Sequence, residues 1–263
     1  MPQEKPLLAR EYVSYSELKI WNECSYRHKL AYIEQKDHFT SNEFTTFGTA
    51  VHTACEKIVL DENLNASKIF NISFNKGIES LEIKNPDLIE QMKLQAETIM
   101  PKVLPALLGK FEDYSVVAVE EELFEDIEFE NNKYQKKFKG YIDLVLKTSD
   151  GKYHIIDWKT CSWGWDARKK SDKMMAYQLV LYKNFYSQKH GIPMENIETH
   201  FALLKRTAKK DNVEFVPVSS GPTRVKNALG FVEKAMKNID KGFSIKNRLS
   251  CKYCPFYNTK DCP

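Results

Sequence analysis

The stretch that decides the fold is residues 140–160, which read GYIDLVLKTSDGKYHIIDWKT. Two apolar, β-branched runs, 139–146 and 153–157, lie on either side of a Ser-Asp-Gly turn, so this stretch predicts an antiparallel β-hairpin. Asp143 and Asp157 then lie on neighbouring strands, beside apolar residues that face the core. Two buried carboxylates repel each other unless a cation neutralises them. A divalent ion that prefers oxygen ligands, Mg²⁺ or Mn²⁺, meets that need.

A lysine completes this pattern. Lys159 follows Asp157 by two residues, so on a strand both side chains project to the same side. An ammonium beside a metal can hold a water molecule or stabilise the charge that develops on a phosphate. Taken alone, D-x-K is a frequent pattern that usually forms an ordinary salt bridge. The G-x-x-D on the adjacent strand favours a metal-dependent site.

The rest of the chain predicts a mixed α/β protein, because helical and strand-like segments alternate along it. Helices are expected from about Ser14 and over residues 49–60, 66–84, 86–108, 171–189 and 222–241. Strands are expected over residues 115–119, 123–129, 197–205 and 213–218, in addition to the hairpin. Pro101 and Pro105 predict a kink or an early end in the helix that contains them.

Composition narrows the class of protein. Apolar residues make up 42% of the chain, which excludes disorder over its whole length. The net charge is only +3, from 39 Lys and Arg against 36 Asp and Glu, which argues against a passive nucleic-acid coat protein. It does not exclude a nuclease, which needs acidic metal ligands beside its basic phosphate contacts. No apolar run approaches the roughly 20 residues of a membrane helix. Residues 1–5 lack the layout of a secretory signal, so we expect a cytoplasmic protein, of a prokaryotic or phage-infected cell, without membrane contact.

Four segments in a fixed order carry a resemblance to a known family: FGTAVH (47–52) with Glu56, GYID (140–143), IDWKT (156–160) and QLVLY (178–182). With them the sequence resembles the PD-(D/E)XK nuclease superfamily, specifically its RecB-type branch, which includes CRISPR-associated exonucleases and the AddB nuclease domain. In this branch the first acidic motif is commonly G-x-x-D. The same pattern occurs here, with Ile142 before Asp143 in place of the proline of the PD motif.

The resemblance implies a restriction-endonuclease-like α/β fold, with a mixed central sheet flanked by helices. A single nuclease domain would span residues 1–263. It would comprise a mainly helical N-terminal part (1–110), a catalytic core (111–220), and a C-terminal helix with a cysteine clasp (221–263).

The resemblance also implies roles for individual residues. The metal ligands would be His52, Asp143, Asp157 and the backbone carbonyl of Trp158. Lys159 would be the catalytic lysine, and Gln178 and Tyr182 would position the scissile strand or support the site. Glu56, one turn after His52, is either a partner of the site or a surface carboxylate. Either Glu120 or Glu121 could direct a carboxylate toward the metal.

Cysteines predict a second metal centre. Cys251, Cys254 and Cys262 fall within the last 13 residues, and Cys24 is the best candidate for a fourth thiolate. Spacing alone fits Zn²⁺ and an iron–sulfur cluster equally, since both accept four thiolates. The resemblance implies a [4Fe–4S] cluster that clasps the two ends of the chain, with Zn²⁺ as the alternative. The remaining Cys55 and Cys161 are expected to be small buried hydrophobes.

An aromatic and basic segment follows the second strand of the hairpin. Trp163 and Trp165 could stack on the bases of a single strand while Arg168 and Lys169 contact its phosphates. Alternatively, the two tryptophans pack on the core.

Together these patterns predict a metal-dependent DNA nuclease, an exonuclease acting on single strands or duplex ends. The sequence has no G-x-x-x-x-G-K-[ST] motif, so the protein would work alone or with a helicase or another recombination or adaptation protein as partner. The alternative is a non-catalytic DNA-end-binding or assembly module of a repair, recombination or CRISPR adaptation complex. The intact set of Asp143, Asp157 and Lys159 favours the enzyme. A zinc-stabilised RNA-binding protein is the third interpretation.

Overall fold

The computed structural model describes residues 10–36, 41–128 and 136–263, so residues 1–5, on which the signal-peptide prediction rests, lie outside the described residues. The chain divides into two compact units. The core unit comprises Ser41–Glu121 and Tyr141–Ser220, and the terminal unit comprises Met1–Thr40, Glu122–Gly140 and Gly221–Pro263. In the described ranges, no helix is long and apolar enough to cross a membrane. The single nuclease domain stays a prediction.

The strands form one mixed sheet, with parallel and antiparallel pairs, and the protein belongs to the predicted α/β class. In chain order they are β1 (Tyr12–Ser14), β2 (Tyr114–Asp126), β3 (Lys137–Thr148), β4 (Tyr153–Cys161), β5 (Ile197–Lys205) and β6 (Val213–Pro217). Their order across the sheet is β1-β3-β4-β5-β6, with β2 also pairing with β3. The β3–β4 pair is antiparallel, with Leu144 opposite Ile156, which confirms the predicted hairpin. The β4–β5 pair is parallel and the β5–β6 pair is antiparallel.

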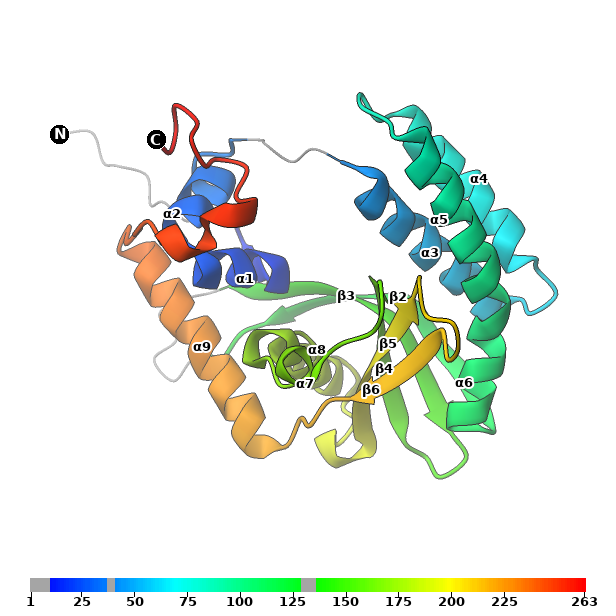
Figure 1. The fold of residues 1–263 in the computed structure, drawn as a ribbon. Coiled ribbons are helices and arrows are strands. Elements are labelled where there is room, and N and C mark those ends of the chain that lie inside the picture. The colour runs from blue at the N-terminus through cyan, green and yellow to red at the C-terminus, as the bar shows by residue number, and fades with distance from the viewer. Residues whose placement is uncertain (1–9, 37–40, 129–135) are drawn as a thin grey trace. The chain divides into compact units, whose positions relative to one another are not determined.

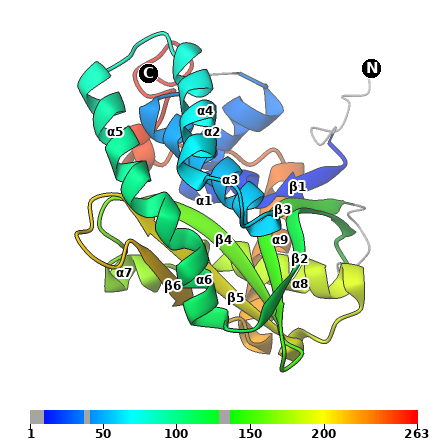
Figure 2. The same cartoon turned by 90° about the vertical axis from the view of Figure 1, so that its right-hand side faces the viewer.

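Helices cover both faces of the strands in the core unit. They are α3 (Glu43–Leu60), α4 (Ala66–Glu79), α5 (Pro86–Ile99), η2 (Met100–Lys102), α6 (Val103–Phe111), α7 (Ala167–Lys170), α8 (Lys173–His190) and η3 (Met194–Asn196). Figures 1 and 2 show α3 to α6 on one face of β4–β6 and α8 on the other. This arrangement of a mixed sheet between helical layers is the restriction-endonuclease-like architecture that the sequence predicted.

Some element boundaries differ from the predictions, and one break follows them, each for a local reason. Helix α3 begins six residues earlier than expected, because the Asn42 side chain accepts hydrogen bonds from the N–H groups of Phe44 and Thr45, each at 3.0 Å. The helix expected over 86–108 ends at Ile99 and restarts at Val103, as the prolines predicted, with Pro101 in the turn between.

The two strands expected near residues 115–129 form one strand, β2, with an irregularity at its centre. Glu120 has φ +50°, a conformation that non-glycine residues adopt rarely. Such a break in the pleat re-aims the neighbouring side chains, as a β-bulge does. Phe129, the last residue of the expected second strand, lies outside the described residues.

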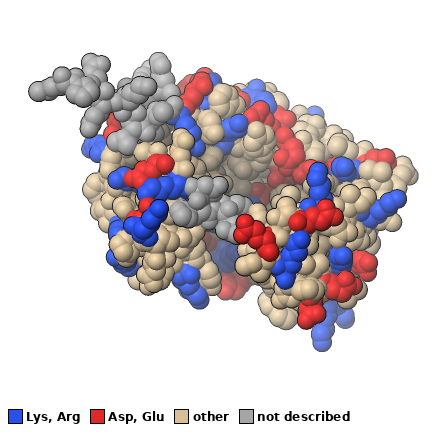
Figure 3. Space-filling model, turned by 90° about the horizontal axis from the view of Figure 1, so that it is seen from above, with Lys and Arg blue, Asp and Glu red and all other residues tan. Residues whose placement is uncertain are grey.

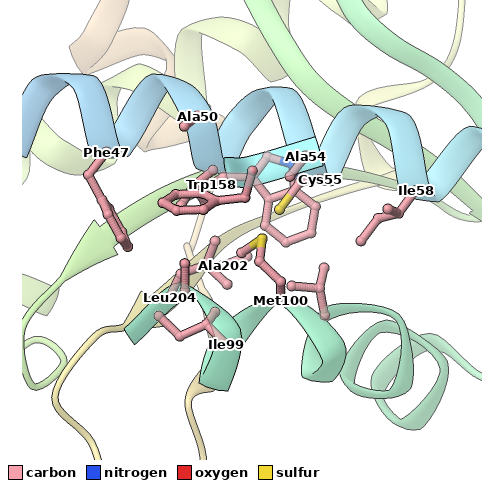
Figure 4. Close-up of a cluster of buried hydrophobic side chains, with 14 of the residues drawn as sticks. Phe47, Ala50, Ala54, Cys55, Ile58, Ile99, Met100, Trp158, Ala202 and Leu204 are labelled. Atoms are coloured by element: carbon pink, nitrogen blue, oxygen red, sulfur yellow. The ribbon is translucent and has the colours of Figure 1, made fainter. Parts of the chain in front are cut away.

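A hydrophobic cluster fills the space between the sheet and helices α3 to α6. Figure 4 shows Phe47 and Cys55 of α3 facing Trp158 of β4, with Met100 of η2 on the opposite side. Trp158 is fully buried. Since successive strand side chains alternate between faces, Asp157 and Lys159 project from the other side of β4, toward α8. The packing of Trp158 therefore fixes which face carries the acidic residue and the lysine.

The terminal unit brings the two ends of the described chain together. Its helices are α1 (Tyr15–Glu23), α2 (Ser25–His28), the π-helical turn η1 (Lys29–Ile33), α9 (Pro222–Asp240) and η4 (Arg248–Tyr253). Ser14 caps α1 by accepting a hydrogen bond from the N–H of Glu17 at 3.2 Å. The N–H of Tyr26 donates to the carbonyl of Ile245 at 3.2 Å, and Figure 1 shows the C-terminal segment beside α2.

Charged side chains of both signs are interspersed on the face of the molecule in Figure 3. This mixture agrees with the small net charge of +3.

Candidate active site

The site begins with the acidic pair of the hairpin. Asp143 is held against β4, because its Oδ2 accepts a hydrogen bond of 2.7 Å from the N–H of Trp158. Asp157 lies on β4 itself, and both aspartates are buried, with 7% and 2% of their surfaces exposed. The structure thus brings the two carboxylates that the sequence singled out to one place.

Three further side chains surround Asp157. Lys159 pairs with its Oδ2. From α8, Gln178 donates a hydrogen bond from Nε2 to its Oδ1 at 2.7 Å. The hydroxyl of Tyr182, one helical turn further, lies 3.4 Å from the same Nε2. Asp157 is therefore oriented by a cation on one oxygen and an amide on the other.

Helix α3 contributes His52 to the same site. Its Nε2 lies 3.0 Å from the carbonyl oxygen of Trp158, which can only accept, so Nε2 carries the hydrogen. Its Nδ1 lies 3.5 Å from Oδ2 of Asp143. Burial of the imidazole opposes protonation, but the hydrogen bond and the charge of Asp143 outweigh it and raise the pKa of His52. His52 thus contacts two of the other predicted metal ligands.

The structure distinguishes between the two glutamates of β2. Glu120 joins His52 and Glu56, and the potential ligand atoms of these three residues all lie within 4.8 Å of one another. Glu121 instead pairs with Lys189 at 2.6 Å and His190 at 3.0 Å, away from this group. The sequence left Glu120 and Glu121 equivalent, because the break in the strand at Glu120 has no signal in the residue types.

The electrostatics of the site fit a bound divalent cation. Burial raises the pKa of Asp157, and the charge of Asp143 adds to this effect, while Lys159 opposes it. Burial, with the charges of Glu56 and Asp143, raises the pKa of Glu120 to about 7. Both shifts mean that the ionised carboxylates are crowded and under-neutralised. A hard divalent ion with oxygen ligands would relieve this repulsion, so the donor set suits Mg²⁺ or Mn²⁺.

The two predicted DNA-binding tryptophans differ in environment. Trp163 is 76% exposed, whereas Trp165 is 8% exposed and packs on Phe201 at 4.9 Å between ring centroids. Gly164 between them has φ +117°, which glycine adopts without strain, and this local turn lets the two rings point apart. Lys169 of α7 lies over the buried ring, 4.9 Å from its centroid. The core-packing interpretation thus suits Trp165, and base stacking stays a prediction for Trp163.

The four predicted cluster cysteines gather in the terminal unit. They line one pocket of the terminal unit: Cys24, Cys251, Cys254 and Cys262. The sulfur of Cys24 accepts backbone N–H hydrogen bonds from Arg27 at 3.4 Å and from Asn247 at 3.3 Å. The same Sγ donates to the carbonyl oxygen of Ile245 at 3.6 Å, so hydrogen bonds hold Cys24 against the C-terminal segment.

The two other cysteines differ from this group. Cys55 is fully buried in the core cluster, and burial raises the pKa of its thiol far above the ordinary value. Cys161 is partly buried, and burial raises its pKa as well. Cys55 is therefore the small buried hydrophobe that the sequence predicted.

The sheet and the carboxylate–lysine site define a nuclease. The family model of the PD-(D/E)XK nuclease superfamily matches residues 12–259, so the chain belongs to this superfamily.

Of two solved structures that match this chain, the first shares its fold. One is the crystal structure of a "putative exonuclease" from Eubacterium rectale, with a TM-score of 0.59, 16% identity, and coverage of 95% of this chain and 88% of that chain. The crystal structure of a protein named SSO0001 has a TM-score of 0.38 and 16% identity, and covers 92% of this chain and 93% of that chain. Among curated proteins, none matches this chain by sequence.

Proposed function

We propose that this nuclease is a RecB-type exonuclease that hydrolyses DNA single strands or duplex ends with the aid of Mg²⁺ or Mn²⁺. The observation that carries the proposal is the convergence of Asp143, Asp157 and Lys159 at one edge of the hairpin. The structural neighbour from Eubacterium rectale is described as a putative exonuclease, which supports the choice of an exonuclease within the superfamily.

Each residue of the site has a defined task in this proposal. His52, Asp143, Asp157 and the carbonyl of Trp158 would hold the ion, with Glu120 beside it. When bound, the ion supplies Lewis acidity to the scissile phosphate and lowers the pKa of a bound water.

The chain's own groups prepare the site for that ion. Lys159 pairs with Asp157 and would present its ammonium to the nucleophilic water or to the developing phosphate charge. Gln178 fixes the orientation of the Asp157 carboxylate by its 2.7 Å hydrogen bond. Outside the metal site, Trp163 would stack on a base, with Arg168 and Lys169 of α7 near the phosphates.

The cysteine pocket would hold a [4Fe–4S] cluster. The four sulfurs line one pocket, and four thiolates suit both Zn²⁺ and an iron–sulfur cluster. The resemblance to the RecB-type branch favours the cluster. The cluster would join residue 24 to the C-terminal tail and so restrict the unfolded chain, which stabilises the terminal unit. A helicase partner and a reducing cytoplasmic compartment belong to the same proposal.

A cleavage assay tests the enzyme. Single- and double-stranded oligonucleotides labelled at the 5′ or the 3′ end are incubated with the full-length protein and Mn²⁺. We expect stepwise shortening from one end, abolished in Asp157→Asn and Lys159→Met and retained in Glu121→Gln, a matched carboxylate outside the site. Equal cleavage by Asp157→Asn would refute the site. The absence of cleavage by every protein would favour the DNA-end-binding module.

Iron analysis tests the cluster separately. Anaerobically prepared protein should contain about four iron atoms per chain. Cys24→Ser should lose the iron and part of the thermal stability together, while Cys161→Ser keeps both. Stoichiometric zinc without iron would replace the cluster by the Zn²⁺ alternative and leave the four-thiolate clasp intact.

A further inference from the structure

A second group of potential metal ligands lies on the opposite face of the sheet. His154 is the second residue of β4, and Glu198 and His200 are alternate residues at the start of β5. In the parallel register His154 is paired with Glu198, so all three side chains share one face. That face also carries Trp158, whereas Asp157 and Lys159 project from the other. The group is therefore separate from the candidate nuclease site.

The three facing atoms of this group have the spacing of metal ligands. Nδ1 of His154 lies 3.3 Å from Nε2 of His200, and Oε2 of Glu198 lies 3.7 Å and 3.8 Å from these two nitrogens. In the plane of the three atoms, the point equidistant from them lies about 2.1 Å from each, which is the length of Zn–N and Zn–O bonds in proteins. A tetrahedral site with such bonds has edges of about 3.4 Å between ligand atoms, close to the observed triangle.

Hydrogen bonding alone does not account for the position of the carboxylate. Hydrogen bonds between nitrogen and oxygen span about 2.7–3.2 Å. Oε2 of Glu198 is beyond that range from both imidazole nitrogens, although it faces them. Its other oxygen, Oε1, accepts a hydrogen bond from Lys152 at 2.8 Å. One oxygen is thus held by a lysine while the other faces two nitrogens at the spacing that a shared cation would require.

The residues around His154 fix the tautomer that ligation needs at this histidine, whereas Nδ1 of His200 is buried and has no hydrogen-bond partner among the described residues. The hydroxyl of Thr148 lies 2.6 Å from Oδ1 of Asp150, which can only accept, so the hydroxyl donates there. It therefore accepts from Nε2–H of His154, at 3.0 Å. The lone pair of His154 is then on Nδ1, directed at His200 and Glu198. A histidine ligand that donates its other N–H to an outer oxygen is the usual arrangement in metal sites.

The group consists of two imidazoles and one carboxylate. Burial lowers the pKa of both histidines, that of His200 to about 4.

The group is also enclosed. The two histidines are 7% and 4% exposed, and the ring of Phe111, at the end of α6, covers both at centroid distances of 4.9 Å and 5.3 Å. Glu198 remains partly exposed and leaves an entry from solvent. An ion here would tie the first residues of β4 to those of β5 beneath α6.

We infer that His154, Glu198 and His200 form a Zn²⁺-class transition-metal site with a structural role, distinct from the oxygen-rich Mg²⁺ or Mn²⁺ site. Two imidazoles and one carboxylate suit Zn²⁺ and Co²⁺ better than Mg²⁺. The inference does not rest on the proposed exonuclease activity.

Co²⁺ is the probe, because its visible spectrum reports its ligands. Full-length protein in excess Mg²⁺, which occupies the carboxylate site, is titrated with Co²⁺. We expect visible d–d absorption without thiolate-to-cobalt charge transfer, which separates this site from the cysteine pocket. Glu198→Gln should weaken this Co²⁺ binding at least about tenfold, and His154→Asn should abolish it. His190→Asn, which removes a histidine outside the group, should leave it unchanged.

A stability measurement completes the test and covers the case in which the histidine variant fails to fold. Glu198→Gln changes a partly exposed side chain, so its fold should persist. Zn²⁺ should raise the melting temperature of the wild type and of His190→Asn, but not of Glu198→Gln. Identical Co²⁺ spectra and Zn²⁺ responses in the wild type and Glu198→Gln would overturn the inference. So would a wild-type Co²⁺ signal that contains only thiolate bands.

Discussion

Gln178 offers the sharpest test of how the site is built, because the sequence left it two roles: support of the metal site or positioning of the scissile strand. In the structure its Nε2 donates to Oδ1 of Asp157 at 2.7 Å, in a buried environment. Gln178→Leu removes this donor with little change in volume. Loss of an outer hydrogen bond to a metal ligand typically lowers metal affinity about 10–100-fold, which corresponds to about 1.4–2.7 kcal/mol.

The same substitution should also affect folding. Asp157 would lose a donor while its carboxylate stays buried, and an unsatisfied buried acceptor costs about 1–3 kcal/mol. Lys159 remains paired with the other oxygen, so we expect the lower part of that range for the loss in unfolding free energy. Tyr182→Phe is the matched control, because its hydroxyl lies 3.4 Å from Gln178, at the limit of a hydrogen bond. Its metal affinity should change less than about threefold.

Two assays separate the roles. Calorimetric titration with Mn²⁺ gives the affinity, and the cleavage rate as a function of Mn²⁺ concentration gives the half-saturating concentration. If Gln178 supports the metal, Gln178→Leu shifts both by the same factor and keeps a rate within a few-fold of wild type at saturating Mn²⁺. An unchanged Mn²⁺ affinity with a reduced rate at saturation would refute this reasoning and assign Gln178 to the DNA strand.

Three further predictions concern other parts of the core unit. Gly77→Ala should lower the unfolding free energy, measured by urea titration, by about 1–3 kcal/mol although alanine has the better helix propensity, because the new Cβ would lie 2.4 Å from Cγ2 of Thr46. Thr46→Ser removes that methyl group, so the double variant should recover the lost stability. Trp163→Ala should weaken single-strand binding by about 1–3 kcal/mol at an unchanged melting temperature, whereas Trp165→Ala should lower the melting temperature instead. Burial and neighbouring carboxylates raise the pKa of Glu120 to about 7 from an ordinary 4.5, so in metal-free protein the unfolding free energy should fall as pH rises from about 4.5 to 7. Urea titrations at several pH values should show a smaller fall in Glu120→Gln than in the wild type, because Asp157, whose pKa is also raised, still contributes.

The parts of the site that the sequence could predict are those encoded by local periodicity. Asp157 and Lys159 are two residues apart on one strand, and Asp143 precedes a tight turn that fixes the pairing of the two strands. Gln178 and Tyr182 are one helical turn apart, so their common direction also follows from spacing. In each case the period of the element is sufficient to place the side chains together.

The rest depends on geometry that has no local signal. The pairing of His154 with Glu198 follows from the parallel register of β4 and β5, two strands joined through helix α8 rather than through a short turn. No pattern within either strand specifies that register. Glu120 differs from Glu121 only through a backbone conformation with φ +50°, which the surrounding packing imposes. The difference in exposure between Trp163 and Trp165 depends likewise on the turn at Gly164.

Trp158 shows how the core and the site depend on each other. Its side chain is fully buried in the hydrophobic cluster under α3, which fixes the position of this residue along and across the sheet. Its N–H donates to Asp143, and its carbonyl accepts from His52, so both of its backbone groups bind residues of the site. A backbone group cannot move to suit a ligand unless the side chain moves with it. The dense packing on one face of β4 therefore preorganises the carboxylates that meet on the other, where burial has left them in need of a cation.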